Sequence, residues 1–233
     1  MIAAAHQPHF LPWLGYLNKV ARSDVFIWLD TVQFRKNYFQ NRTRIAGVDG
    51  VERWLTLPVH AHLDTAINAV EVAEPRWKDR VGKTIQQMYG KAAHFAECWE
   101  PLHAELAGAS NRLADVNYRL FRVVLDLLGI ATARVVVASE LSVVETEPTD
   151  RLVKLCEAVG ASSYIAGKGG RQYMREEAFA SAGIDVIWQQ FDVARTQYPR
   201  GTGTPLVGLS VIDCLFHAGP ERARELVDDA WIP

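Results

Sequence analysis

The first thirty residues combine apolar runs and polar loops in a pattern that few folds accommodate. Residues 2–5 (IAAA) are short and apolar, and a polar loop at residues 6–9 (HQPH) follows them. Residues 14–20 then carry apolar side chains at helical spacing, and residues 25–29 (VFIWL) form a second apolar run of strand length. A strand, a helix and a second strand within so short a segment predict the β-α-β unit that opens a parallel sheet.

The rest of the chain extends this α/β pattern with two interruptions. Further apolar runs of strand length occur at residues 135–138, 164–166 and 186–188. Residues 45–72 hold short extended candidates and predict a small antiparallel β insertion, whereas residues 75–129 carry a helical pattern. The sequence therefore predicts an α/β fold with a Rossmann-like parallel-sheet core, a small β insertion and a helical middle segment.

The last helix is predicted to begin at Ser210 and to end at Gly219. Ser210 and Asp213 have the spacing of a capping box, with aspartate in place of the usual glutamate. Glycine is the residue that most often ends a helix, which makes Gly219 the expected stop.

Charge and cysteine content exclude several classes of protein. The chain has 233 residues, with 25 basic and 27 acidic side chains and a formal net charge of −2. This balance argues against a dedicated nucleic-acid binder, so no DNA partner is expected. The three cysteines lie far apart, which argues against a disulfide framework. No apolar run approaches the ~20 residues that span a bilayer, and residues 1–5 do not resemble a secretory signal. We expect a cytoplasmic protein.

The polar loop after the first strand holds two histidines three residues apart, His6 and His9. Imidazoles in a loop between a strand and a helix can donate hydrogen bonds to phosphate oxygens, and the helix that follows adds oriented backbone N–H groups. A histidine near its ordinary pKa of about 6.5 also suits proton transfer at neutral pH. Two alternatives remain: the pair could bind a metal ion, or it could only satisfy backbone carbonyls.

This loop resembles the HxGH signature of nucleotidyltransferases and class I aminoacyl-tRNA synthetases. In those enzymes the histidines stabilise charge on a triphosphate as pyrophosphate leaves. Pro8 stands where the signature has glycine, so the resemblance is partial.

A second polar segment follows the second strand. Asp30 directly ends that strand, and we predict a catalytic role for it beside His6 and His9. The segment from Gln33 to Arg42 is dense in amides and cations, which suit an oxygen-rich ligand, and its aromatic residues could stack on a sugar or a base. The alternative is a solvated loop. The predicted substrate-binding residues are Gln7, Gln33, Asn37, Asn41, Arg42 and Tyr173.

A third segment follows the strand at residues 164–166. Glycines there would allow the backbone to wrap around an anion, and two cations would add charge. We predict phosphate binding by Gly167, Lys168, Gly169, Gly170 and Arg171. The segment is not a Walker A motif, because its spacing differs and the serine or threonine is missing. A plain left-handed turn is the alternative.

A fourth candidate is the pair His60 and His62, which lies close to Asp64. With His6 and His9 this pair could form a zinc-like set. Alternating histidines on an extended segment are more often an exposed strand edge. We therefore predict no metal site.

The sequence blocks HQPHFLPWLGYLNK, SDVFIWLDTVQFRKNYFQNRTRI, YIAGKGGRQYM and LSVIDCLFHAG resemble the WbqC-like protein family. The resemblance covers nearly the whole chain and implies a single α/β domain over residues 1–233. It implies biosynthesis of bacterial surface polysaccharides or specialised metabolites as the setting. The motif positions are His6, Gln7, His9, Asp30, Gln33, Asn41, Arg42, Gly167, Gly170, Tyr173 and Asp213.

These observations favour a transferase or ligase-like enzyme. Its predicted substrate is an anionic, phosphate-bearing small molecule such as a nucleotide, a nucleotide-sugar or an activated amino acid. A metal-dependent hydrolase or lyase that uses the His6 and His9 loop is one alternative, and a non-catalytic sugar- or nucleotide-binding protein is another. The sequence names neither a cofactor nor an oligomeric state.

Overall fold

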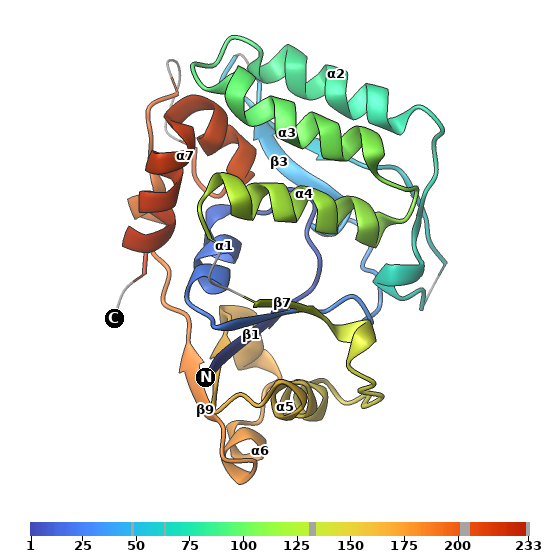
Figure 1. Cartoon of the computed structure of the whole chain (residues 1–233), viewed down its shortest axis with the longest axis vertical. Coiled ribbons are helices and arrows are strands. Elements are labelled where there is room, and N and C mark those ends of the chain that lie inside the picture. The colour runs from blue at the N-terminus through green and yellow to red at the C-terminus, as the bar shows by residue number, and fades with distance from the viewer. Residues whose placement is uncertain (48, 63, 131–133, 201–205, 232–233) are drawn as a thin grey trace.

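The computed structural model describes residues 1–233 except 48, 63, 131–133, 201–205 and 232–233. A five-stranded sheet with the order β7-β2-β1-β8-β9 lies between two layers of helices (Figure 1). All of its strands pair in parallel. They are β1 (Ile2–His6), β2 (Val25–Trp28), β7 (Arg134–Val137), β8 (Ser163–Ala166) and β9 (Asp185–Trp188). The parallel-sheet α/β fold predicted from the sequence is thus confirmed.

The order in which the strands are added creates a switch point beside the first strand. From β1 the chain passes through α1 (Leu14–Ala21) to β2 and later to β7, which extends the sheet on one side. The strands β8 and β9 extend it on the other side. Connections therefore diverge between β1 and β8, and open parallel sheets bind ligands at the carboxyl ends of their strands at such a point.

Helices cover both faces of the sheet, and alternate residues of each strand face opposite cores. Ala4 of β1 and Phe26 of β2 face the larger core, whereas Ala3 and Ile27 face the smaller one. The larger core is formed with α1, α2 (Trp77–Tyr89), α3 (Phe95–Gly108), α4 (Leu113–Leu127) and α7 (Val211–Asp229). The smaller core is formed with α5 (Pro148–Val159) and α6 (Glu176–Ser181). Figure 1 shows the two groups of helices on opposite sides of the sheet.

Two short antiparallel pairs of strands lie between β2 and α2. The strands β3 (Arg42–Ala46) and β4 (Glu52–Thr56) form one pair, and β5 (Val59–His60) and β6 (Glu71–Val72) form the other. Neither pair joins the parallel sheet. The antiparallel segment thus begins at Arg42, three residues before the boundary expected from the sequence. Short 3-10 turns complete the fold: η1 (Ile67–Ala69), η2 (Ala138–Glu140), η3 (Lys168–Gln172) and η4 (Val193–Thr196).

The predicted capping box at the start of α7 is wrong. The Ser210 hydroxyl donates to the backbone carbonyl of Leu11 (2.8 Å) rather than capping the helix. The carboxylate of Asp213 is fully buried and accepts four hydrogen bonds of 2.7–3.0 Å. Its donors are the hydroxyls of Tyr89 and Tyr198 and the guanidinium of Arg200, which together with Asp213 we call the anchor cluster.

The predicted stop at Gly219 is confirmed for the first part of α7. Gly219 does leave the helical conformation (φ 83°, ψ 165°), but α7 resumes at once and continues to Asp229. Pro220 begins the second part, and proline is well tolerated at the first position of a helix because the N–H that it lacks has no partner there. The glycine therefore ends one helical part, and a second part that the sequence did not predict follows across the kink.

Within the described part of the chain, no helix is both long enough and apolar enough to span a membrane.

Candidate functional site

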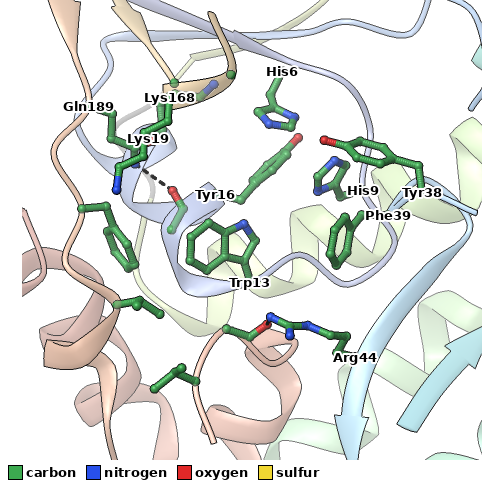
Figure 2. Close-up of a pocket in the computed structure, with 17 residues that line it drawn as sticks. His6, His9, Trp13, Tyr16, Lys19, Tyr38, Phe39, Arg44, Lys168 and Gln189 are labelled. Carbon is green, nitrogen blue, oxygen red and sulfur yellow. Dashed lines mark hydrogen bonds between the residues drawn. The ribbon is translucent and has the colours of Figure 1, made fainter. Parts of the chain in front are cut away.

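A cleft of about 600 Å³ opens at the switch point, where the carboxyl ends of β1 and β8 meet (Figure 2). We call it the main cleft. Its polar and aromatic lining comes from the end of β1 and the loop after it, from α1, from β3 and the segment before it, and from the segments after β8 and β9. The chemistry-bearing residues are His6, His9, Trp13, Tyr16, Lys19, Tyr38, Phe39, Arg44, Lys168 and Gln189. His6, His9 and Lys168, which the sequence assigns to strand ends, thus line one cleft.

A smaller cleft of about 370 Å³ adjoins the first, and we call it the side cleft. Gln7, Arg35, Gln172 and Tyr173 contribute its polar groups. The residues that line both clefts are His6, Lys19, Tyr38, Gly167 and Gly169.

His6 is the last residue of β1, and its tautomer follows from its hydrogen bond. Its Nδ1 lies 3.0 Å from the backbone carbonyl of Gln7. Because a carbonyl can only accept, a neutral His6 carries its proton on Nδ1 and leaves Nε2 as an acceptor. His6 is therefore arranged to take a proton at Nε2.

His9 is buried, with 4% of its surface exposed, and it lies among aromatic rings. The ring centroid of His6 is 4.6 Å away, and those of Tyr16, Tyr38 and Phe39 lie within 5.1–5.6 Å. Neither ring nitrogen of His9 has a hydrogen-bond partner among the described residues. Buried polar nitrogens are rarely left unpaired in native proteins. The ring nitrogens of His9 are therefore free to pair with a bound molecule.

Burial and the charge of Lys19 lower the pKa of both histidines, that of His9 to about 3. Both imidazoles are thus neutral at pH 7. The expectation of a histidine near its ordinary pKa of 6.5 is therefore wrong for this site, because the loop is enclosed rather than solvated. A neutral imidazole still serves as a proton acceptor, and an anion placed beside it would raise its pKa.

Lys19 lies on α1 and was not predicted from the sequence. Only 3% of its surface is exposed, and its Nζ donates to the backbone carbonyl of Ala5 (2.9 Å). Burial lowers the pKa of Lys19 to about 7. A lysine in this setting is poised to gain stability from an anion, because a nearby negative charge favours its protonated form. His6, His9 and Lys19 together are called the cleft cluster below.

The glycine-rich segment after β8 divides between the cleft and the protein surface. Lys168 is exposed and lines the main cleft, whereas the guanidinium of Arg171 lies over the ring of Trp188 (4.4 Å) and lines neither cleft. Gly167 and Gly169 line both clefts, and Gly170 lines the side cleft. None of the three glycines has a positive φ, so the segment is a 3-10 turn and not the left-handed turn that was the alternative.

Asp30 has a partner within the protein. Its carboxylate is buried and accepts hydrogen bonds from the backbone N–H (3.0 Å) and the hydroxyl (2.8 Å) of Ser139. This contact joins the end of β2 to the segment that follows β7. Asp30 lines neither cleft.

The predicted substrate-binding residues also separate in space. Gln7 and Tyr173 line the side cleft. Gln33, Asn37, Asn41 and Arg42 line neither cleft. Gln33 donates to Asp64, Asn41 donates to the Leu57 carbonyl, and Arg42 bonds to Asn37 and stacks over Trp54 at 4.0 Å.

Sequence reasoning missed several residues of the main cleft besides Lys19. Gln189 directly follows β9, so the rule that sites gather at strand ends could have found it; its amide donates to the Gly15 carbonyl at 2.8 Å. Tyr16 lies three residues before Lys19 on α1, with its hydroxyl 3.3 Å from the Gln7 carbonyl. No sequence signal indicates Arg44, which is held by Glu52 (3.3 Å) and by the Gly208 carbonyl (2.7 Å).

The described lining of the two clefts has an uneven balance of charge. None of the described residues that line either cleft is an aspartate or a glutamate. Lysines and arginines therefore set the potential there although the whole chain carries a net charge of −2. A concave site whose lining carries only positive charge attracts anionic ligands.

The exposed residues His60 and His62 lie outside both clefts. In the part of the chain that the structure describes, no group of three or more histidine, cysteine, aspartate or glutamate side chains could hold a metal ion.

Comparison with known proteins agrees with the sequence blocks. The model of the WbqC-like protein family matches residues 7–225. The chain is also 31% identical over 225 residues to the uncharacterized protein Rv1507c of Mycobacterium tuberculosis, covering 92% of this chain and 93% of that protein. No solved structure matches the chain. With a family match over most of its length and a relative that aligns almost end to end, the chain belongs to the WbqC-like protein family.

Proposed function

We propose that the main cleft binds an anionic, phosphate-bearing small molecule and transfers a group from it to an acceptor. The observation that carries this proposal is the buried ammonium of Lys19: among the described residues its only partner is the Ala5 carbonyl, and the described lining of the cleft contains no carboxylate. A buried charge without a counter-ion is costly, and an anionic ligand would supply the missing partner.

Two cations would contact the phosphate, one in the interior of the cleft and one at its rim. Lys19 lies at the bottom, and Lys168 is exposed at the edge. Charge-assisted hydrogen bonds from both would hold the phosphate oxygens and stabilise the charge that develops when the phosphate leaves.

A neutral histidine would act as the general base of the transfer. The O–H or N–H group of the acceptor attacks the transferred group, and the bond between that group and the phosphate oxygen breaks. The electron pair of that bond leaves with the phosphate, which Lys19 and Lys168 hold. The proton of the acceptor passes to Nε2 of His6, because Nδ1 is occupied by the Gln7 carbonyl.

The proposed setting is biosynthesis of surface polysaccharides or specialised metabolites in the bacterial cytoplasm. Family membership supports the biosynthetic setting, and the three cysteines, which are all free and buried, agree with a reducing compartment. Asp30 and Arg171 would support the site from outside, through Ser139 and Trp188.

Calorimetric titration of pyrophosphate, ADP and a nucleotide-sugar into the purified protein tests the proposal. We expect binding that weakens as salt rises, because charge pairs that are partly exposed are screened over ~8–10 Å at ordinary ionic strength. Lys19→Met should weaken it, whereas Lys91→Ala, which removes an exposed lysine outside both clefts, should not. If none of the three compounds binds, or if Lys91→Ala weakens binding as much as Lys19→Met, the proposal is wrong.

A further inference from the structure

At the carboxyl edge of the sheet, the two clefts border the cores on its opposite faces. Trp13, Phe191 and Val193 of the main cleft pack against the larger core. Leu29, Leu152 and Tyr164 of the side cleft belong to the smaller core. A ligand in one cleft would thus rest on a different layer of the protein from a ligand in the other.

The clefts meet where the ionisable groups are. The residues that they share end β1, follow β8, or reach the same point from α1 and from the loop before β3. Both His6 and Lys19 are among them. A molecule that fills either cleft would therefore present one of its ends to the same pair of side chains.

We propose that the two clefts form a two-substrate site, in which the main cleft holds the phosphate-bearing donor and the side cleft binds a hydroxyl-rich, sugar-like acceptor. This inference rests on the function proposed above for the main cleft and adds a second binding site with its own ligand.

The groups that line the side cleft suit hydroxyls. Gln7 accepts from Gln40 through its Oε1 (2.7 Å), which leaves its Nε2 to donate. Gln172 adds a second amide, and Tyr173, with 51% of its surface exposed, adds a phenol at the rim. Amides and phenols both donate and accept, as sugar hydroxyls do.

Two further features define the class of the acceptor. Aromatic rings at the rim, Tyr38 and Tyr173, offer flat apolar faces to the C–H side of a sugar ring. No carboxylate occurs among the described lining residues, so a positively charged amine would find no partner there. Arg35, held over the ring of Tyr38 at 4.9 Å, would instead tolerate a sugar that carries an acid group.

His6 lies where the two clefts meet, so it could take a proton from an acceptor bound in the side cleft. An acceptor hydroxyl that enters from the side cleft would reach the shared residues and transfer its proton to Nε2 of His6. The donor phosphate would lie on the other side of the same histidine, next to Lys19. Transfer between two bound molecules requires such a junction, whereas hydrolysis requires only the donor and water.

Binding measured with one probe for each cleft tests the proposal. The probe for the main cleft is pyrophosphate, followed by calorimetry. The probes for the side cleft are D-glucose, D-galactose, D-mannose and N-acetyl-D-glucosamine, followed by saturation-transfer NMR at up to about 50 mM, which detects even millimolar affinity. Each titration is repeated with the other probe at saturation.

Paired variants then separate the clefts. The double variant Gln172→Ala/Tyr173→Ala removes polar groups of the side cleft only, and Lys168→Ala removes a charge of the main cleft only. We expect the first to weaken sugar binding about tenfold or more and to leave pyrophosphate affinity unchanged, and the second to do the reverse. All three side chains are exposed, so these variants should fold, and Lys91→Ala is the control that should change neither affinity.

Each outcome decides between the possibilities. Simultaneous binding of both probes, with the crossed effects of the variants, supports the two-substrate site. If a sugar competes with pyrophosphate, or if no sugar binds while pyrophosphate does, the side cleft is not an acceptor site and the proposed function of the main cleft still stands. If pyrophosphate itself does not bind, the proposed function fails first.

Discussion

Two buried polar clusters of this protein differ in whether their groups satisfy one another. In the anchor cluster, the carboxylate of Asp213 accepts hydrogen bonds from Tyr89, Tyr198 and Arg200, and charge is paired with charge. In the cleft cluster, all three ionisable groups are bases whose pKa burial lowers, and no carboxylate is among them to pair with their charge. Both clusters are buried, so burial alone does not explain the difference.

The comparison suggests how to separate structural from functional polar groups. A saturated cluster has no capacity left for a ligand, and the anchor cluster instead holds the segment after β9 against α7. An unsaturated cluster such as His9 and Lys19 retains unused donors and acceptors at some expense in stability. Proteins retain such groups mainly where a ligand completes them.

The largest effect should follow from breaking the anchor cluster. Asp213→Ala leaves the guanidinium of Arg200 buried without its partner, so we expect the free energy of unfolding to fall by about 3–5 kcal/mol in urea titrations. Glu225→Ala on the same helix removes an exposed pair with Arg222 and should change it by less than ~1 kcal/mol. Equal effects of the two variants would contradict a structural role of the anchor cluster.

Lys19→Met should act in the opposite direction on stability. The pKa of Lys19 is about 7 in the folded protein against an ordinary value of 10.5, so the unfolded chain binds this proton more tightly. The wild type therefore bears a penalty that is complete below about pH 7 and fades as the pH rises toward 10.5. We expect the variant to be the more stable protein at pH 7, with the difference in unfolding free energy shrinking toward pH 10.

The same substitution should weaken pyrophosphate binding. Loss of one charge-assisted hydrogen bond costs about 1.5–3 kcal/mol, which is roughly a ten- to hundredfold weaker affinity in calorimetry. A variant that is more stable and yet binds as tightly as the wild type would show that Lys19 does not face the ligand.

The sequence could predict the place of the site but not its most informative residue. Strands β1 and β8 are short buried runs followed at once by polar residues, so the positions of His6 and Lys168 follow from the rule that strand ends meet at one edge. Lys19 could not be found in this way, because a lysine on a short amphipathic helix is expected to face solvent. Lys19 is instead buried at the edge of the sheet, where its Nζ donates to the Ala5 carbonyl of β1 and lines both clefts together with Gly167 after β8.

Asp30 shows what the strand-end rule leaves open. It also ends a strand at the correct edge, but Ser139 after β7 takes both of its oxygens. A pattern of residue types can place a carboxylate at the edge of the sheet, but it does not show which neighbour donates hydrogen bonds to that carboxylate. The same limit applies to Ser210 and Asp213, whose spacing fits a capping box although their partners lie in distant segments.

A more moderate effect is expected for His9, where a large and a small apolar replacement can be compared. Because neither nitrogen of His9 has a partner among the described residues and aromatic rings surround it, His9→Phe should retain the packing and leave the melting temperature within a few degrees. His9→Ala leaves a cavity and should be less stable. Turnover or ligand binding should fall in both variants, and His62→Ala, an exposed histidine outside both clefts, should match the wild type.

The pH dependence of the His9 variants provides an independent check. The pKa of His9 is about 3 in the folded protein and 6.5 in the unfolded chain, so the unfolded chain binds more protons between these values. Wild-type stability should therefore fall as the pH drops below about 6.5, and His9→Phe should lose less over the same range. Identical slopes would mean that His9 is not the buried neutral group described above.

The smallest effect should come from Lys168, which shares the main cleft with Lys19 but lies in contact with solvent. Water and salt screen an exposed charge, so Lys168→Ala should weaken pyrophosphate binding by about tenfold at low ionic strength, near the lower limit for a charge-assisted contact. That difference should largely disappear near ~1 M salt, where the screening length is ~3 Å, whereas the effect of Lys19→Met should persist because its ammonium is enclosed. Calorimetric titrations of both variants across the salt range make this comparison. If the two lysines show the same salt dependence, the distinction between an enclosed and an exposed cation in this cleft does not hold.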